Sequence, residues 1–167
     1  SLVKSTICGL ETWFHHSVLN VYKKNIDYVI CPSQFMSQMF LRAGWLNTKI
    51  IHLPYFQPQV DPPLADNTHP KDYILYFGRL SKEKGIDTLI KVMKNLPDVK
   101  LKIVGMGPES NNYSSLITHH SLQNIELFGY ESGNELNKII ANAKFIIIPS
   151  IWYENYPLSI LEAYAVG

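Results

Sequence analysis

The chain has 167 residues, of which 46% are hydrophobic and 17% are charged, and its formal net charge is +1. This composition predicts a folded chain with a substantial core, made of one large domain or parts of two. The near-neutral balance excludes a broad nucleic-acid or anionic-membrane surface, which needs a clustered excess of basic residues. Any anion that binds must therefore be held by a few placed cations.

Short apolar runs predict strands, and amphipathic stretches between them predict helices. In chain order, we expect strands at 27–31, 49–53, 73–77, 101–105, 124–128 and 144–148. We expect helices at 10–24, 33–43, 83–95, 110–120 and 132–142. Ser33 and Ser132 suit helix N-caps, and Gly44 suits a helix end.

The apolar runs lack a polar face, which is typical of parallel strands covered by helices. Their alternation with helices predicts right-handed crossovers and a three-layer α/β fold with Rossmann-like parallel sheets. The alternation stops at PYFQPQVDPPLADNTHP, which holds five of the ten prolines. We interpret 57–71 as a linker between an α/β unit at 1–56 and a second at 72–167.

Two cysteines, Cys8 and Cys31, are too few for a disulfide framework, and neither belongs to a Cys-x-x-Cys pair. We expect buried free thiols in a reducing compartment such as the cytoplasm. The longest apolar run, FIIIP, is far too short to cross a bilayer.

Cationic side chains follow the strand expected at 73–77. In open parallel sheets, ligands bind where the carboxyl ends of strands lead into helices. The loop GRLSKEKG holds Gly78, Arg79 and Lys84 at such a position. An arginine fork, a lysine point charge and free helix N–H groups suit a diphosphate. The alternative is that both cations are solvated surface charges.

The next loop, VGMGPES, contains Gly105 and Gly107. It is not a complete dinucleotide fingerprint, because Ser110 replaces the third glycine and the loop follows the second strand of its unit. Either the glycines form a tight turn before the helix, or their missing side chains let a ligand approach the backbone.

Two carboxylates follow the last expected strand, in PSIWYENYPLSILEAYAVG. Pro157 suits the start of a helix, where its missing N–H costs nothing. We therefore expect Glu154 in the loop and Glu162 on the helix, where they could bind different parts of an elongated ligand. Carboxylates accept hydrogen bonds from sugar and ribose hydroxyls, so a general acid and base pair is not required. Three aromatic residues either line a pocket here or pack: Trp152, Tyr153 and Tyr156.

Four motifs in this order resemble the donor-binding domain of the retaining glycosyltransferases of family 4, the group 1 glycosyltransferases of GT-B fold: YFGRLSKEKGIDTLI, LKIVGMGPE, IELFGY and PSIWYENYPLSILEAYAVG. The earlier segments IDYVICPSQFMSQMFLRAGW and KIIHLPYF resemble the end of the acceptor-side domain. The resemblance implies that 1–56 is the last part of the acceptor-side domain and that 72–167 is the first part of the donor-binding domain. We therefore expect a fragment, with sheets incomplete at both ends and little activity alone.

The resemblance also implies roles for matched positions. Arg79 and Lys84 would hold the diphosphate of a nucleotide-sugar donor and stabilise the leaving group, and Glu154 would bind the donor sugar; these are the expected catalytic residues. Glu162 would bind the ribose hydroxyls. The other expected donor-binding residues are Gly78, Gly107, Phe128 beside the base, Asn155, Tyr156, Leu158 and Ser159. Pro157 departs from the glycine of many relatives and removes one amide donor.

The implied activity is transfer of a hexose-type sugar, with retention, from a UDP-sugar or GDP-sugar to a glycan or lipid-linked acceptor, as in polysaccharide or lipopolysaccharide biosynthesis. No metal, other cofactor or nucleic acid is expected. A lipid-linked acceptor would place the parent protein peripherally at the inner membrane face, although no basic amphipathic helix supports this.

Two alternatives remain open at the level of sequence. One is a non-catalytic nucleotide-sugar-binding or interaction module. The other is a dinucleotide-dependent oxidoreductase, which requires a complete glycine fingerprint and an acidic residue about twenty positions further on. The sequence supplies Arg79 and Lys84 at the place of that fingerprint.

Overall fold

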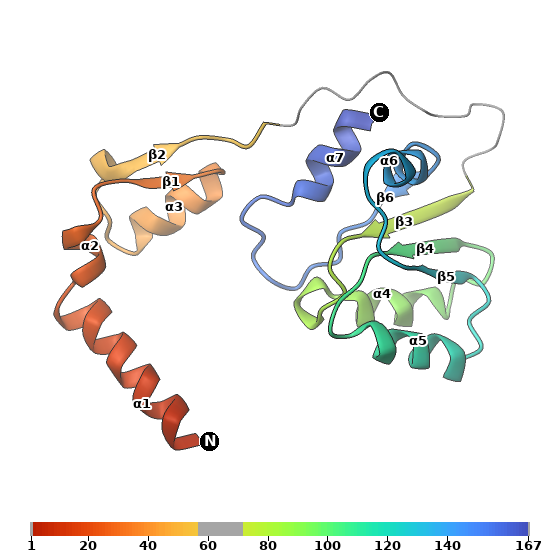
Figure 1. The fold of residues 1–167 in the computed structure, drawn as a ribbon, viewed down its shortest axis with the longest axis horizontal. Helices are drawn as coiled ribbons and strands as arrows, with labels where there is room; N and C mark the ends of the chain where they lie inside the picture. The colour runs from red at the N-terminus through yellow and green to blue at the C-terminus, as the bar shows by residue number, and fades with distance from the viewer. Residues whose placement is uncertain (1, 57–71, 167) are drawn as a thin grey trace. The chain divides into compact units, whose positions relative to one another are not determined.

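The structure is a computed structural model that describes residues 2–56 and 72–166. The chain forms two compact units, Ser1–Tyr55 (unit 1) and Phe56–Gly167 (unit 2), which are described separately (Figure 1). The linker expected at 57–71 lies outside the described residues. Within these residues, no helix has the length and apolar character needed to cross a membrane.

Unit 1 contains a two-stranded parallel sheet and three α-helices. Its elements are α1 (Leu2–Trp13), a π-helical segment (Phe14–Val18), α2 (Val21–Asn25), β1 (Val29–Cys31), α3 (Gln34–Arg42), a 3-10 turn (Asn47–Lys49) and β2 (Ile50–His52). The single helix expected at 10–24 is wrong, because Asn20 adopts a left-handed conformation at φ 50° and separates α2 from the preceding helix. Cys31 is buried as expected, whereas Cys8 is exposed.

Helix α3 begins and ends where the sequence predicts. The Ser33 hydroxyl accepts a hydrogen bond from the Met36 amide at 3.1 Å, which makes Ser33 the N-cap. Gly44 adopts φ 77°, and its amide donates to Leu41 while the Trp45 amide donates to Phe40. The rings of Phe40 and Trp45 meet edge to face at 5.4 Å, which completes a Schellman ending. The cap and the ending let the chain return from β1 to a parallel β2.

Unit 2 contains a four-stranded parallel sheet in the order β5-β4-β3-β6. Its elements are β3 (Tyr73–Phe77), a 3-10 turn (Lys82–Lys84), α4 (Ile86–Met93), β4 (Lys100–Val104), α5 (Ser110–His119), β5 (Ile125–Phe128), α6 (Gly133–Ala141), β6 (Phe145–Ile146) and α7 (Leu158–Val166). The helix expected at 83–95 begins only at Ile86, because Gly85 at φ 69° separates it from the 3-10 turn.

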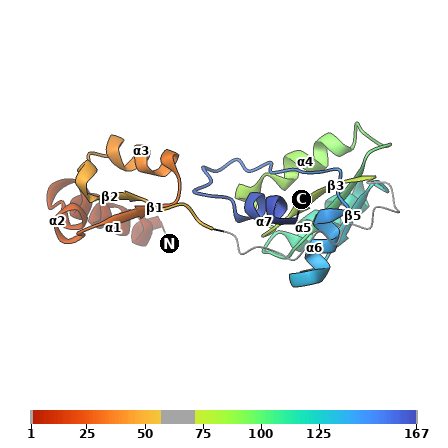
Figure 2. The same ribbon diagram turned by 90° about the horizontal axis from the view of Figure 1, so that it is seen from above.

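Helices cover both faces of this sheet, and the core alternates along β3. Ile74 and Tyr76 pack with α4 and α5. Tyr73, Leu75 and Phe77 pack with α6 and α7 on the opposite face. Figure 1 shows α6 and α7 above the strands and α4 and α5 below them, and Figure 2 views the same layers from above. The parallel, three-layer α/β fold predicted from the sequence is confirmed.

The strand order places a topological switch point between β3 and β6. The chain runs from β3 outward through β4 to β5, and then returns to place β6 on the other side of β3. Ligands of such sheets bind in the crevice at the carboxyl ends of the two strands where the order reverses. The segments that follow β3 and β6 are those that carry Arg79, Lys84 and Glu154.

Candidate functional site

The loops after β3 and β4 are held together by backbone hydrogen bonds. The Gly78 amide donates to Val104, the Leu80 amide donates to Met106, and the Glu109 amide donates to Leu80, each at 3.0 Å. These bonds continue the sheet past its strand ends, so the backbone on both sides of Arg79 is fixed.

The glycines of the VGMGPES loop are required by this packing. A Cβ on Gly105 would lie 2.0 Å from the Gly78 carbonyl oxygen, and one on Gly107 would lie 2.2 Å from the Leu80 carbonyl oxygen. Such distances are far inside van der Waals contact, so a side chain would push the two loops apart. The space that Gly107 leaves is thus occupied by the Leu80 backbone.

A second close approach joins the segments after β3 and β6. A Cβ on Gly85 would lie 2.1 Å from the Pro149 carbonyl oxygen, and the Ile151 amide donates to Glu83 at 3.0 Å. These contacts bring Lys84 and Glu154 together although 70 positions separate them in the chain.

Two clefts open at the carboxyl edge of the sheet. The switch-point cleft has a volume of about 330 Å³ and is lined by Tyr76, Phe77, Gly78, Arg79, Lys84, Ile148, Ser150, Glu154, Tyr156, Pro157, Leu158, Ser159 and Glu162. The α6 cleft has a volume of about 380 Å³ and is lined by Phe77, Gly78, Arg79, Val104, Gly105, Met106, Tyr130, Glu131, Ser132, Gly133, Leu136 and Glu162. Since Arg79 and Glu162 line both, the clefts share a wall and can bind one elongated ligand.

Lys84 and Glu154 form an ion pair inside the switch-point cleft. The Lys84 Nζ lies 2.7 Å from Glu154 Oε1, and the Ser150 hydroxyl donates to the same oxygen at 2.6 Å. The side chains are only 29% and 25% exposed. Burial favours a higher pKa for Glu154, but the hydrogen bonds from Lys84 and Ser150 outweigh it, so the pKa lies below its usual value. Glu154 is therefore a fixed carboxylate at neutral pH.

Glu162 projects from α7 at the junction of the two clefts. Burial raises the pKa of its carboxyl, and in the part of the chain that the structure describes no cation pairs with it. A half-buried carboxylate without a cationic partner is well suited to accept hydrogen bonds from a ligand. As predicted, Pro157 directly precedes α7 and separates this carboxylate from Glu154 in the loop.

Arg79 is exposed on the wall common to both clefts. Its backbone is fixed by the Tyr76 phenol, which donates to the Arg79 carbonyl oxygen at 2.9 Å. Burial raises the pKa of Tyr76 above its usual value, so the phenol keeps the proton for this bond. The guanidinium and the Lys84 ammonium thus offer two positive charges beside the junction.

Most of the residues expected at a donor site line the switch-point cleft: Gly78, Arg79, Lys84, Glu154, Tyr156, Leu158, Ser159 and Glu162. Gly107, Phe128 and Asn155 line neither cleft. The Phe128 ring instead lies over the Lys102 ammonium at 4.9 Å. Sequence reasoning missed Ser150 and Glu131, which follow β6 and β5 and could have been found by the rule applied to Arg79.

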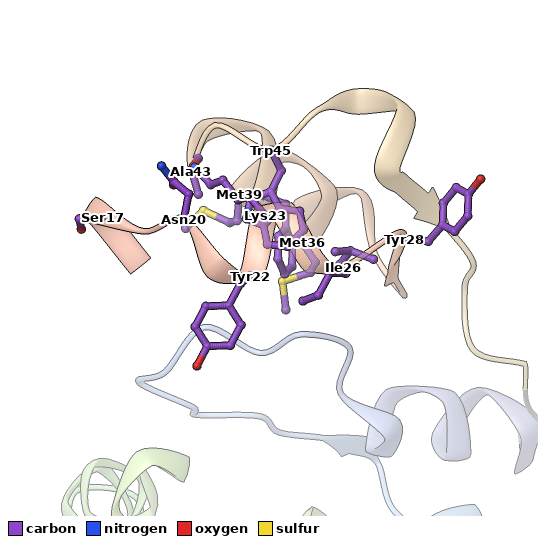
Figure 3. Close-up of a pocket in the computed structure, with 12 residues that line it drawn as sticks. Ser17, Asn20, Tyr22, Lys23, Ile26, Tyr28, Met36, Met39, Ala43 and Trp45 are labelled. Carbon is purple, nitrogen blue, oxygen red and sulfur yellow. The ribbon is translucent and has the colours of Figure 1, made fainter. Parts of the chain in front are cut away.

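Unit 1 contains a larger cavity, of about 920 Å³, lined by Ser17, Asn20, Tyr22, Lys23, Ile26, Tyr28, Val29, Met36, Met39, Phe40, Ala43 and Trp45. Figure 3 shows Met36, Met39 and Trp45 gathered beside Lys23. The Lys23 ammonium donates to the Ala43 carbonyl at 2.6 Å, and none of the lining residues is a carboxylate. The apolar cavity thus lacks the paired charges of unit 2.

Comparison with known proteins supports a single family. The model of "Glycosyl transferases group 1" matches residues 64–167. The sulfoquinovosyl transferase SQD2 of Arabidopsis thaliana is 24% identical over 90% of this chain and 31% of its own length. The lipopolysaccharide core biosynthesis glycosyltransferase LpsD of Rhizobium meliloti is 25% identical over 75% of this chain and 38% of its own length. The chain thus spans about a third of these curated relatives.

Solved structures share the fold. The Anabaena protein Alr3699/HepE, determined in complex with UDP and glucose, superposes with a TM-score of 0.74 over 88% of this chain and 44% of that protein, at 20% identity. Staphylococcus aureus TarM superposes with a TM-score of 0.73 over 88% of this chain and 30% of that protein, at 22% identity.

Proposed function

The chain belongs to the group 1 glycosyl transferases, and we propose that unit 2 binds a nucleotide-diphosphate sugar for a retaining, family 4 type of sugar transfer. The main support for this proposal is the set of charged residues in one cleft. The cations Arg79 and Lys84 and the carboxylates Glu154 and Glu162 line one cleft at the switch point of a parallel sheet.

The shared wall of the two clefts suggests how the donor lies. The diphosphate binds at Arg79 and Lys84, and the ribose hydroxyls donate to Glu162 at the junction. The base then enters the α6 cleft, and the sugar lies in the switch-point cleft beside Glu154. Leu158 and Ser159 of the first turn of α7 line the same cleft, and the N–H groups of a first helical turn favour a negative diphosphate.

In this arrangement, the reaction breaks the bond between the anomeric carbon and the diphosphate oxygen. The electron pair leaves with the phosphate, where Arg79 and Lys84 stabilise the developing charge. The acceptor hydroxyl forms the new bond on the face that the diphosphate leaves and passes its proton to the departing phosphate oxygen, so the anomeric configuration is retained. Glu154 holds a sugar hydroxyl as a hydrogen-bond acceptor. No metal ion is assigned a role, because the two side-chain cations supply the charge.

The acceptor is proposed to be a glycan or a lipid-linked sugar, and the transferred group a hexose-type sugar. The relatives include proteins named as a sulfoquinovosyl transferase and as lipopolysaccharide core biosynthesis glycosyltransferases. Unit 1 is proposed to belong to the acceptor-side domain. Peripheral association with a membrane and a cytoplasmic location are parts of the same proposal.

Ligand-observed NMR of the 167-residue chain with UDP-sugars, GDP-sugars and NAD tests the proposed donor class. We expect one class of nucleotide sugar to bind and NAD not to bind. Arg79→Ala should abolish the signal, and Glu162→Gln should weaken binding about tenfold. The matched control is Lys82→Ala, since Lys82 lies in the same loop, is 79% exposed and lines neither cleft. Binding that both cleft variants leave unchanged would place the ligand elsewhere and contradict the proposal.

A further inference from the structure

The α6 cleft carries a carboxylate whose role the proposed transfer does not explain. Glu131 follows β5 at the carboxyl edge of the sheet, is half-buried and lines only this cleft. In the described part of the chain, no cation lies within ion-pair distance of it. Lys138 of α6 pairs with Glu135 at 2.8 Å.

The charged side chains balance along most of the proposed path of the donor. Lys84 and Glu154 pair in the switch-point cleft, and Arg79 and Glu162 both lie at the junction. Beyond the junction, Glu131 is the charged residue that lines the α6 cleft alone. The far end of this cleft therefore attracts a neutral group that donates hydrogen bonds, and it disfavours a second anionic group.

The nucleobases differ in what they offer to a carboxylate. An ionised carboxylate only accepts hydrogen bonds, and it accepts two at once when two donors lie side by side. Guanine presents adjacent N1–H and N2–H donors. Uracil presents one N3–H donor between two carbonyl acceptors, which would repel the carboxylate. Adenine and cytosine each place an acceptor nitrogen next to their amino group.

We propose that Glu131 makes the α6 cleft selective for guanine, so that the donor is a GDP-sugar; this inference rests on the proposed function. Tyr130 and Met106 line the same cleft and are 70% and 62% exposed. Their ring and thioether offer flat and polarisable surfaces for the base, independent of its identity. In this proposal, Tyr130 and Met106 contact the faces of the base, and Glu131 accepts hydrogen bonds from the edge of guanine that carries N1–H and N2–H.

Titration calorimetry of the 167-residue chain with GDP, IDP and UDP tests the inference. IDP keeps N1–H but lacks the 2-amino group, so it removes one of the two bonds to Glu131. We expect GDP to bind about tenfold more tightly than IDP and more than about tenfold more tightly than UDP, as for hydrogen bonds to a charged group. Glu131→Ala should bring the three affinities together. The matched control Glu135→Ala, which changes an exposed carboxylate of α6 outside the cleft, should keep the order.

The outcomes separate the inference from the proposed function. Equal affinities for GDP and UDP, or a GDP preference that persists in Glu131→Ala, would overturn the role of Glu131 and leave the donor site intact. Binding of none of the three diphosphates would contradict both. Because the comparison of GDP with IDP uses the unchanged chain, it does not depend on the folding of a variant.

Discussion

Lys84 forms an ion pair with Glu154 inside the switch-point cleft, so replacing Lys84 should affect stability as well as ligand binding. Among the described residues, Lys84→Met leaves a three-quarters buried carboxylate with Ser150 as its remaining hydrogen-bond donor. We expect the free energy of unfolding at neutral pH to fall by about 1.5–3 kcal/mol, the usual range for a hydrogen bond to a charged group. Urea unfolding measures this loss, and the exposed Lys82→Met is the control.

The same variant has a defined pH dependence. The pKa of Glu154 is lowered in the folded chain, so its stabilising contribution is present above the pKa of the unfolded carboxyl. That contribution disappears as the pH falls through the lower, folded pKa. The unchanged chain and Lys84→Met should therefore converge in stability in strong acid. An equal difference at neutral and acid pH would show that the ion pair is not the cause.

Glu162 should set the pH dependence of donor binding. Burial raises the pKa of Glu162, and only its ionised form accepts both ribose hydroxyl bonds. Affinity should therefore fall as the pH decreases through this raised pKa. The Glu162→Gln variant should bind the donor about tenfold more weakly near neutral pH, because it loses charge-assisted hydrogen bonds. Its affinity should not fall further as the pH decreases. Calorimetric titrations across the acid range compare the two; identical pH profiles would remove Glu162 from the ribose site.

At the scale of elements, the close approach of the loops after β3 and β4 predicts a strong effect at Gly107. Gly107→Ala places a Cβ 2.2 Å from the Leu80 carbonyl oxygen and should cost about 3 kcal/mol or more of unfolding free energy. Gly129→Ala is a matched control, because nothing lies within 4 Å of its Cβ position. Thermal unfolding compares the two. Similar melting temperatures would mean that the two loops separate easily. Close packing of the loops would then not explain why position 107 is a glycine.

The sequence predicts elements well where local chemistry decides them. Ser33 and Gly44 mark the ends of α3 through hydrogen bonds to their own neighbours. Asparagine adopts the left-handed conformation more readily than most residues, but whether it does so at position 20 depends on the surrounding chain, so the break could not be predicted. Gly85 lies inside the helix expected at 83–95 but in fact separates the 3-10 turn from α4. A glycine is required there because the Pro149 carbonyl oxygen would clash with a Cβ, and this long-range contact is not visible in the sequence.

The candidate site shows the same division between local and long-range effects. Apolar runs fix the strands, and the rule that ligands bind at carboxyl ends points to Arg79, Lys84 and Glu154. The ion pair between Lys84 and Glu154 spans the switch point and depends on the strand order β5-β4-β3-β6, which is not visible in a linear sequence. The same rule also points to Glu131 after β5, but the sequence does not show that Glu131 lines a cleft with residues from α6 and from the loops after β3 and β4.

At the scale of the whole molecule, the proposed charge balance predicts independence from divalent metals. If Arg79 and Lys84 alone neutralise the diphosphate, an excess of a chelator should leave the affinity for the nucleoside diphosphate unchanged. Added magnesium should weaken it slightly by binding the free ligand. Calorimetry with and without chelator measures this, and a large loss of affinity on chelation would show that a metal ion shares the diphosphate.

The most direct test of the account is a crystal structure of the 167-residue chain with the nucleotide sugar that binds most tightly. The account predicts phosphate oxygens at Arg79 and Lys84, ribose hydroxyls at Glu162 and the sugar beside Glu154, with the base in the α6 cleft. A diphosphate bound away from Arg79 and Lys84, or a reversed ligand with its sugar in the α6 cleft, would contradict it.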